Sequence, residues 1–351
     1  MKRFDYSFLN DRIVDSGMLD RILKIQEFKG KAEEIKGKAP DIFIELESIA
    51  RIQSVRGSNA IEGIVTSDER MTAIVNRKSA PKNHNEMEIA GYRDALNIIH
   101  NEYKAIQFNE AVILGFHKIL MTHLPRGSEG YKKNDNVIVD VDNMGYKHIR
   151  FRPVPAEETE AAMQQLMLAY YTARDDHSIN PLLLIPCFIL DFLCIHPFSD
   201  GNGRMSRLLS LLMMYKEDLD IGKYISFEEQ INQSKERYYD SLKRSSEEWH
   251  ENENDYVPFI EDFIGTLYLC YKELDRRFIT VGDKKMNKTN RIEAAVLNNI
   301  LPISKREICE LLLDVSETTV EFVLSQMIKD GKIKRVGNNR NARYIRNEKD
   351  P

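Results

Sequence analysis

Residues 195–208 read IHPFSDGNGRMSRL, and this stretch holds the densest cluster of functional side-chain types in the chain. It directly follows the apolar segment PLLLIPCFILDFLCI at 181–195, which predicts a buried core helix. The proline after His196 ends that helix, so we expect the imidazole to face a cleft. Gly201 and Gly203 allow the backbone to turn sharply and to approach a ligand closely. The stretch therefore predicts a ligand-binding loop between two helices.

The polar residues of this loop suit a phosphate group. Asp200 is a hard oxygen ligand of the kind that holds Mg²⁺ together with nucleotide phosphates. Asn202 can donate its amide to a phosphoryl oxygen, and a helix that begins near Gly203 points free N–H groups at the same anion. Arg204 and Arg207 lie three residues apart on that helix, so both can reach phosphates. Each feature alone is common in a turn or a cap, whereas the whole run predicts a phosphate site.

The run HPFSDGNGR, followed by Arg207, resembles the signature HPFx(D/E)GNGRxxR of the Fic family at every fixed position. The resemblance implies an enzyme that transfers AMP from ATP to a protein hydroxyl, with Mg²⁺ or Mn²⁺ as the metal. Doc-type kinases of the family carry a Lys within the loop, whereas Gly203 precedes Arg204 here as in the AMP-transferring members. The resemblance implies that His196 is the general base and that Asp200 is the metal ligand. It implies an anion hole for the α-phosphate at Gly201, Asn202 and Gly203. It also implies that Arg204 contacts the β-phosphate, that Arg207 contacts the γ-phosphate and that Phe198 is an apolar anchor.

A second motif lies upstream, in the sequence SNAIEG at 58–63. Its spacing places Ser58 and Glu62 on one face of a short helix that Gly63 closes, and on its own it reads as a capped helix with a solvated glutamate. Beside the signature it resembles the inhibitory motif (S/T)xxxE(G/N) of the family. The resemblance implies a Glu62–Arg207 salt bridge that occupies the γ-phosphate arginine, so that ATP binds in an unproductive pose. It implies the class whose inhibitory helix precedes the signature.

Two further features lie close to the signature in the chain. VIVDV at 137–141 and YKHIRF at 146–151 flank the turn DNMG and predict a hairpin. The resemblance implies a flap that registers the target segment by strand addition, and a surface hairpin without a role is the alternative. Tyr238 and Tyr239 follow the signature by one helix. The resemblance implies that Tyr239 packs against the adenine base, with ordinary core packing as an equal alternative.

Helical periodicity predicts a mainly α fold, with an all-helical Fic core, a β-hairpin flap and a C-terminal winged helix-turn-helix domain. The predicted helices lie near 40–56, 84–104, 108–123, 156–173, 181–195, 203–216, 228–247 and 255–278. The predicted domains are an N-terminal helical region with the inhibitory helix at 1–105, a Fic catalytic core at 106–275, a linker at 276–290 and a winged-helix domain at 291–346.

The C-terminal segment has its own charge. Residues 284–351 carry 14 Lys and Arg against 9 Asp and Glu, whereas the whole chain has a net charge of −5. Three helices, with Ser304 and Ser316 as caps, precede a basic hairpin. DNA is one partner that this layout suits, and a protein is the other, because Glu317 and Glu321 lie on the predicted recognition helix. The basic residues are Lys329, Lys332, Lys334, Arg335, Arg340, Arg343 and Arg346.

The remaining expectations come from composition. The four cysteines form no CxxC pair, the N-terminus lacks a signal peptide, and the longest apolar run is too short to span a bilayer, so we expect a cytoplasmic protein without membrane contact. Expected partners are ATP, a target protein, the chain itself as a substrate and a second copy in a homo-oligomer. Two other functions compete with AMP transfer. One is removal of AMP from a modified target, alone or in a bifunctional enzyme, in which Glu62 would orient a water. The other is DNA-binding regulation by a protein whose Fic domain is vestigial.

Overall fold

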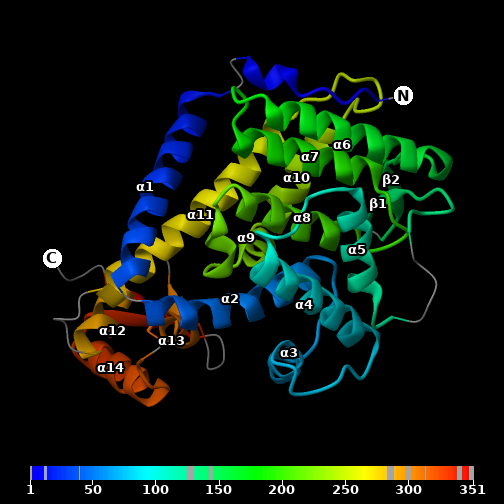
Figure 1. The fold of residues 1–351 in the computed structure, drawn as a ribbon. Coiled ribbons are helices and arrows are strands. Elements are labelled where there is room, and N and C mark those ends of the chain that lie inside the picture. The colour runs from blue at the N-terminus through cyan, green and yellow to red at the C-terminus, as the bar shows by residue number, and fades with distance from the viewer. Residues whose placement is uncertain are drawn as a thin grey trace. The chain divides into compact units, whose positions relative to one another are not determined.

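The computed structural model describes residues 2–11, 14–38, 40–124, 130–141, 145–282, 288–297, 302–312, 314–337 and 342–347. It confirms a mainly helical fold with a two-stranded hairpin and a small C-terminal sheet (Figure 1). In chain order the elements are α1 (Ser16–Lys38), α2 (Pro40–Ile61), α3 (Asp68–Val75), α4 (His84–Glu102), α5 (Glu110–Met121), β1 (Ile138–Val141), β2 (Lys147–Phe151), α6 (Thr159–Asp175), α7 (Pro181–Ile195), α8 (Asn202–Lys216), α9 (Phe227–Gln233), α10 (Lys235–Ser246), α11 (Val257–Gly282), α12 (Lys288–Leu297), β3 (Ile303–Ser304), α13 (Lys305–Leu311), α14 (Glu317–Lys329), β4 (Ile333–Val336) and β5 (Arg343–Arg346).

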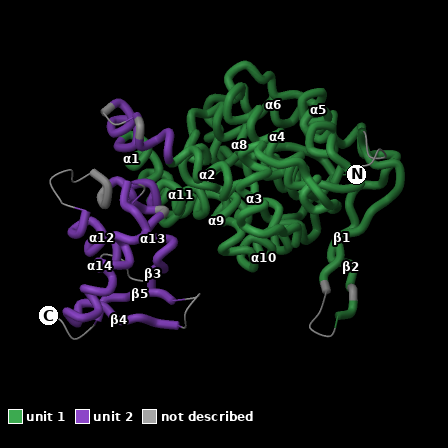
Figure 2. Tube along the Cα trace, turned by 90° about the horizontal axis from the view of Figure 1, so that it is seen from below, with its two compact units in different colours: residues 1–30, 46–271 green, residues 31–45, 272–351 purple. Residues whose placement is uncertain are grey.

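The chain forms two compact units, which Figure 2 colours separately. Unit 1 comprises Met1–Gly30 and Leu46–Tyr271, and unit 2 comprises Lys31–Glu45 and Lys272–Pro351. The domain limits expected from the sequence stay a prediction. Helix α11 continues to Gly282 inside the range predicted as a linker, and 283–287 lie outside the described residues.

Helix α7 is the centre of unit 1. It is apolar on all sides, and all of its residues except Pro181 and Leu193 are buried. Asn180 caps its first turn by accepting a hydrogen bond from the Leu182 N–H at 2.9 Å, and Pro181 suits the first helical position because no backbone donor is needed there. Helices α6, α8 and α10 all contact α7, and Figure 1 shows them beside it. The loop at 196–201 therefore begins at the end of an almost fully buried helix.

One carboxylate lies inside this apolar helix. Asp191 is fully buried and accepts hydrogen bonds from the Tyr6 hydroxyl at 2.7 Å, from Trp249 Nε1 at 2.7 Å and from the Tyr256 hydroxyl at 2.9 Å. Burial raises the pKa of Asp191, and the charge of Lys2 and the three donors oppose that rise. The network ties the N-terminal segment and the segment before α11 to α7, a short distance along the helix from His196.

The C-terminal half of α2 is fixed against α9 and α4. A Cβ at Gly57 would lie 2.8 Å from the Glu229 backbone nitrogen, so only glycine allows this close approach of α2 to α9. Glu228 is fully buried and accepts hydrogen bonds from Ser54 Oγ at 2.8 Å and from the Tyr92 hydroxyl at 2.9 Å. Ser54 lies one turn before Ser58 and Gly57 one residue before it, so these contacts set the position of the segment that ends at Glu62.

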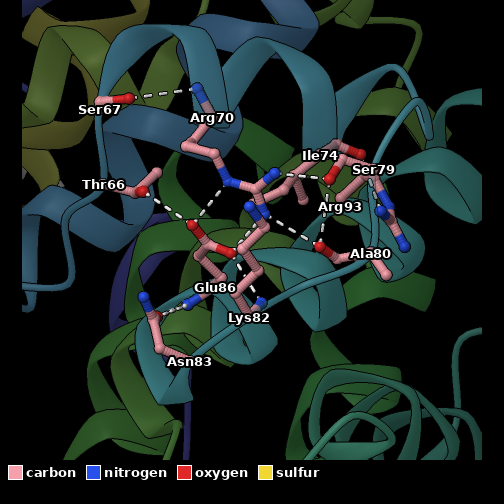
Figure 3. A network of polar contacts seen from close by, with 10 residues as sticks. All are labelled: Thr66, Ser67, Arg70, Ile74, Ser79, Ala80, Lys82, Asn83, Glu86 and Arg93. Carbon is pink, nitrogen blue, oxygen red and sulfur yellow. Dashed lines mark hydrogen bonds and ion pairs between the residues drawn. The ribbon is translucent and has the colours of Figure 1, made fainter.

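The chain that leaves α2 is held by a second polar network (Figure 3). Glu86, at the start of α4, accepts hydrogen bonds from Arg70 Nε at 2.9 Å, from Thr66 Oγ1 at 3.2 Å and from the Lys82 N–H at 2.7 Å. The hydrogen bond from Arg70, above all, lowers the pKa of Glu86 to about 2. Arg70 also donates to Ser79 Oγ. The Arg70–Glu86 pair therefore holds the connecting segment between α2 and α4 against the start of α4.

The hairpin of unit 1 has an irregular register. Strands β1 and β2 are antiparallel, with Val139 opposite Ile149 and Ile138 opposite Phe151, so Arg150 is the extra residue of a β-bulge. In Figure 2 the hairpin extends away from the helices of its unit. The strands lie within the segments predicted from the sequence. Of the predicted turn, 142–144 lie outside the described residues.

Unit 2 contains the three C-terminal helices and an antiparallel sheet in the order β3–β5–β4. Ser304 begins α13 with a complete capping box that includes Glu307, and Ser316 caps α14, as predicted. A continuous apolar core joins the three helices to the sheet through residues such as Val296, Leu312 and Met327. The element order matches the predicted winged helix, whose assignment stays a prediction, and Arg340 lies outside the described residues.

The structure corrects three expectations about helices. Ser58 lies in the last turn of the 22-residue α2 and not on a separate short helix, because Gly63, with a φ of +78°, ends a helix that began at Pro40. The predicted helix at 228–247 is two helices that meet at Ser234. Helices α1 and α3 were not predicted, since α1 buries few apolar residues and α3 is short.

No described helix combines the length and the apolar character that crossing a membrane requires.

We expect Asp191→Ala to lower the free energy of unfolding by about 3 kcal/mol, because it leaves three buried donors without an acceptor. Urea unfolding followed by the fluorescence of Trp249, the one tryptophan of the chain, measures this change. Asp175→Ala, at an exposed aspartate at the end of α6, is the control and should change the stability by less than about 0.5 kcal/mol. Equal effects of the two substitutions would contradict the role given to Asp191.

Candidate functional site

The loop between α7 and α8 is built from two left-handed residues. His196 ends α7 with a φ of +52°, and its N–H donates to the Phe192 carbonyl at 2.9 Å. Gly201 begins α8 with a φ of +81°, a conformation that glycine adopts without strain. A non-glycine residue such as His196 pays about 1–3 kcal/mol for this backbone conformation, and such strain is concentrated at functional sites.

The ring of His196 has a defined proton position. Its Nδ1 lies 3.2 Å from the Leu193 carbonyl oxygen, which can only accept, so Nδ1 carries the hydrogen and the lone pair of the neutral ring is on Nε2. Burial lowers the pKa of His196 to about 4, with further lowering from the charges of Lys132 and Arg150. The imidazole is therefore neutral at physiological pH, as a general base must be.

Two residues that the sequence analysis missed hold this loop in place. Lys132 is buried and donates from Nζ to the Ile195 carbonyl at 3.1 Å and from its backbone N–H to the Pro197 carbonyl at 2.8 Å. Asn136 accepts from Lys132 Nζ at 2.8 Å and donates to the Phe198 carbonyl at 3.2 Å. Both come from the polar run before β1, where no spacing or motif distinguished them from ordinary loop residues.

Phe198 and Asn202 close the loop from within. Phe198 is fully buried and stacks on the ring of His117 at a centroid distance of 3.7 Å, so it packs the loop against α5. Asn202 accepts from the Phe198 N–H at 2.9 Å and donates to the Phe198 carbonyl at 2.7 Å. The amide expected at the phosphate thus makes a pair of bonds within the loop, and its contact with a phosphoryl oxygen stays a prediction.

Arg204 and Asp200 lie at the start of α8. Arg204 is almost fully buried, with Nη1 at 2.6 Å from Glu88 Oε2 and Nη2 at 3.3 Å from Asp200 Oδ2. The Asp200 side chain is 63% exposed, and its Oδ1 accepts from the Gly201 N–H at 2.6 Å. The described residues contain no group of three or more metal-binding side chains. One exposed carboxylate suits Mg²⁺ that takes its other ligands from phosphates and water.

Arg207 joins α8 to the end of α2. Its Nε donates to Ser58 Oγ at 2.9 Å, and its Nη2 donates to the Ser58 carbonyl at 3.0 Å and to Glu62 Oε1 at 2.8 Å. Arg207 is almost fully buried, whereas the Glu62 side chain is 34% exposed. Burial raises the pKa of Glu62, but the charge and the hydrogen bond of Arg207 outweigh it and hold this pKa below its ordinary value.

The Glu62 carboxylate lies directly on the first turn of α8. A Cβ at Gly203 would be 2.2 Å from Glu62 Oε1 and 3.3 Å from Arg207 Nη1, so the carboxylate occupies space that any other residue at 203 would fill. The N-terminus of a helix favours an anion through its dipole and its free N–H groups. Glu62 is therefore at the place where the sequence predicted a phosphate.

A cavity of about 640 Å³ collects part of the predicted site. It is lined by five of the predicted residues, namely Glu62, His196, Gly203, Arg207 and Tyr239. Helices α7 and α10 add apolar side chains that include Leu193 and Leu242, and the hairpin adds Ile138, Val139, Asp140, Arg150 and Phe151. The other predicted residues, Ser58, Gly63, Asp200, Gly201, Asn202 and Arg204, are not among its lining residues.

Comparison with known proteins agrees with this geometry. Residues 107–214 match the model of the Fic/DOC family. The chain is 27% identical over 205 residues to the protein adenylyltransferase Fic of Nematostella vectensis, and the match covers 56% of this chain but only 44% of that protein.

Solved structures share the fold at low identity. A Fic family protein from Desulfovibrio desulfuricans G20 has a TM-score of 0.60 and 21% identity, with 96% of this chain and 98% of that chain covered. A Fic domain-containing signalling protein from Bacteroides thetaiotaomicron has a TM-score of 0.57 and 20% identity, with coverage of 72% and 97%. Fic-1 from C. elegans has a TM-score of 0.51 and 16% identity, with coverage of 72% and 74%. Residues 107–214 therefore match the Fic/DOC family model, and the chain shares the mainly helical fold of solved Fic proteins.

Proposed function

We propose that this chain is a protein adenylyltransferase, which transfers AMP from ATP to a hydroxyl side chain of a target protein and which Glu62 inhibits in cis. One observation carries the proposal. A neutral histidine with a free Nε2 shares a cavity with the first turn of α8 and with Arg207, which is already paired with Glu62. A base, an anion-binding helix start and a carboxylate that competes with the anion are the parts that regulated nucleotidyl transfer requires.

The reaction that these parts support is a single displacement. The hydroxyl oxygen of the target attacks the α-phosphorus of ATP, and His196 Nε2 takes the hydroxyl proton as the new P–O bond forms. The bond between the α-phosphorus and the oxygen that bridges to the β-phosphorus breaks, and pyrophosphate leaves with the electron pair. The α-phosphate oxygens would lie against the N–H groups of the first turn of α8, at Gly203.

The remaining phosphates would be held by residues around that turn. Arg204 would contact the β-phosphate and Arg207 the γ-phosphate, with Gly201 and Asn202 closing the anion hole. Asp200 would bind Mg²⁺ or Mn²⁺ together with phosphate oxygens, and the metal would neutralise charge on the leaving group. Tyr239 lines the same cavity and would pack against the adenine base.

Inhibition follows from the contacts of Arg207. Glu62 Oε1 and Ser58 engage Nη2 and Nε of Arg207, so a γ-phosphate must displace a buried charge-assisted pair to reach this guanidinium. Because Glu62 also covers Gly203, the same carboxylate competes with the α-phosphate. A hundredfold suppression requires about 2.7 kcal/mol of coupling, which a pair of this kind can supply.

The hairpin has the surface that target recognition needs. It forms a sheet of only two strands, so each strand leaves an edge to which an extended segment can add. Its exposed apolar side chains are Val137, Val139, Tyr146 and Ile149. Strand addition at this edge would bring the hydroxyl of the target segment to the cavity that contains His196.

Removal of AMP is the second candidate reaction. Glu62 lines the cavity with His196, and its lowered pKa keeps the carboxylate ionised, so it could orient a water toward a phosphodiester. An enzyme that catalyses both reactions would use one His196 in both directions. Incubation of the purified chain with a target already carrying AMP separates this candidate from transfer.

The partner of unit 2 is open between DNA and protein. Lys332 pairs with Glu293 at 3.2 Å and Arg343 with Glu307 at 3.1 Å, so two of the predicted DNA contacts already have carboxylate partners. Lys305 pairs with Glu317 and Glu321 at the predicted recognition helix. A gel shift with random duplex DNA at low salt, made with and without residues 284–351, distinguishes the two partners.

We expect Glu62→Gly to raise self-modification with α-³²P-ATP by about ten- to a hundredfold, because it frees Arg207 and uncovers Gly203. Glu102→Gly is the matched control, since Glu102 is an exposed glutamate at the end of α4, and it should leave the signal unchanged. The double variant Glu62→Gly, His196→Ala should lose the label. An unchanged signal in Glu62→Gly would show that the carboxylate does not inhibit.

The pH dependence of transfer tests the environment of His196. Its pKa of about 4 lies below the ordinary 6.5, so the base is neutral from about pH 5 upward. The rate of Glu62→Gly should therefore change little between pH 6 and 8 and fall below about pH 5, as the imidazole gains a proton. Self-modification at saturating ATP across this range is the measurement. A rate that climbs with a midpoint near pH 6.5 would argue against the buried, neutral ring.

A further inference from the structure

Arg150 enters the cavity through the β-bulge of the hairpin. The pairs Ile138–Phe151 and Val139–Ile149 leave Arg150 without a residue opposite it on β1. A bulge locally changes the direction of a side chain, and bulges are concentrated beside active sites for that reason. Arg150 lines the same cavity as His196 and Arg207, so the irregularity of β2 delivers a cation to the candidate reaction centre.

The guanidinium of Arg150 is incompletely paired. Its side chain is only 14% exposed, and its Nε is buried and has no hydrogen-bond partner among the described residues. The ion-pair partner on the neighbouring strand, Asp140 Oδ1, lies 3.8 Å from Nε, which is too far for a hydrogen bond, and its side chain is half exposed. An arginine in a protein is always charged, so a buried donor in this state favours a ligand with anionic oxygens.

The neighbours of Arg150 indicate where that anion lies. Its Cζ is 5.9 Å from the ring centroid of Tyr239, and Lys235 Nζ is 5.8 Å from the same ring. Glu62, the other carboxylate of the cavity, is bound to Arg207. Arg150 is thus a largely buried cation of the cavity, and its long ion pair with Asp140 leaves Nε without a hydrogen bond among the described residues.

We propose that Arg150 binds the phosphate of the nucleoside monophosphate group, so that the hairpin contributes its own contact to the anion held at the first turn of α8. This inference rests on the proposed function and names a further substrate-binding residue for it. A guanidinium suits the role because its fork of donors matches two phosphate oxygens at once. The AMP group is present in transfer and in removal, so the contact would serve both reactions.

A carboxylate of the target segment is the other anion that could reach Arg150. Phosphate is favoured because Gly203 and Arg207, which also line the cavity, belong to the predicted phosphate site. The two anions differ in a simple way. A contact with phosphate changes nucleotide binding in the absence of any target, whereas a contact with a target carboxylate does not.

The test is titration calorimetry of the full chain with AMP and with adenosine, in the Glu62→Gly background. Arg150→Gln should weaken AMP binding by about ten- to a hundredfold and leave adenosine binding unchanged, since a charge-assisted hydrogen bond to phosphate is lost. Arg150→Lys should weaken AMP binding less. Arg152→Gln is the matched control, because Arg152 is exposed, lies two residues away and does not line the cavity, and it should bind both ligands like the parent.

Three results would overturn the assignment. AMP affinity equal to that of the parent in Arg150→Gln would exclude the phosphate contact, even if the KM for a target then changed. An equal loss for adenosine and AMP would place Arg150 at the base beside Tyr239. A lowered melting temperature of Arg150→Gln together with an unaltered AMP affinity in Arg150→Lys would assign Arg150 a structural role. A parent that binds neither AMP nor ATP would contradict the proposed function itself and not this assignment alone.

Discussion

The hydrogen bonds of Arg207 are the contact on which the site depends. A guanidinium that is almost fully buried is stable only if its charge and its donors are paired. Here the pairing groups are Ser58 and Glu62, which lie 149 and 145 residues away along the chain. Helix α8 therefore needs the end of α2 beside it, and the connection between the two is part of the architecture of the site.

The surrounding structure holds that end of α2 from both sides. Before Ser58, the close approach at Gly57 and the buried Glu228 fix the helix against α9 and α4. After Gly63, the Arg70–Glu86 network closes the chain onto α4. Between these supports the exposed residues are Glu62 and Gly63 at the end of the helix and Val65 just after it. Rigid flanks with a short free segment suit a carboxylate that changes partner without unfolding its helix.

The loop between α7 and α8 could be predicted from the sequence because its functional residues are close together in the chain. His196, Gly201 and Arg207 lie within twelve positions, and the apolar helix before them is recognisable by composition alone. The supports of the loop are different. Lys132 and Asn136 act through contacts made 60 or more residues away, and a lysine in a polar run looks like any solvated lysine. Helix α1 escaped prediction for a related reason, since few of its residues are buried and its pattern is weak.

The hairpin shows a further limit of sequence patterns. In a regular strand, side chains alternate between the two faces, so Arg150 would point to the face opposite to Ile149 and Phe151. The bulge interrupts this alternation at Arg150. A bulge depends on how two strands pair, so it cannot be predicted from the sequence of either strand alone. The surroundings of Tyr239 could not be predicted for the same reason, because they involve two separate segments. Its ring lies beside Lys235 of α10 and Arg150 of the hairpin.

Gly203 is the position where the proposed inhibition and the proposed catalysis meet. The space above its α-carbon holds the Glu62 carboxylate in this structure, and the same space is where an α-phosphate would meet the helix N-terminus. Under the proposed function, any side chain at position 203 would displace the Glu62 carboxylate and would also fill the space that the α-phosphate needs. If Glu62 inhibits as proposed, a substitution at Gly203 cannot relieve the inhibition without also obstructing the nucleotide, whereas a change at Glu62 itself can.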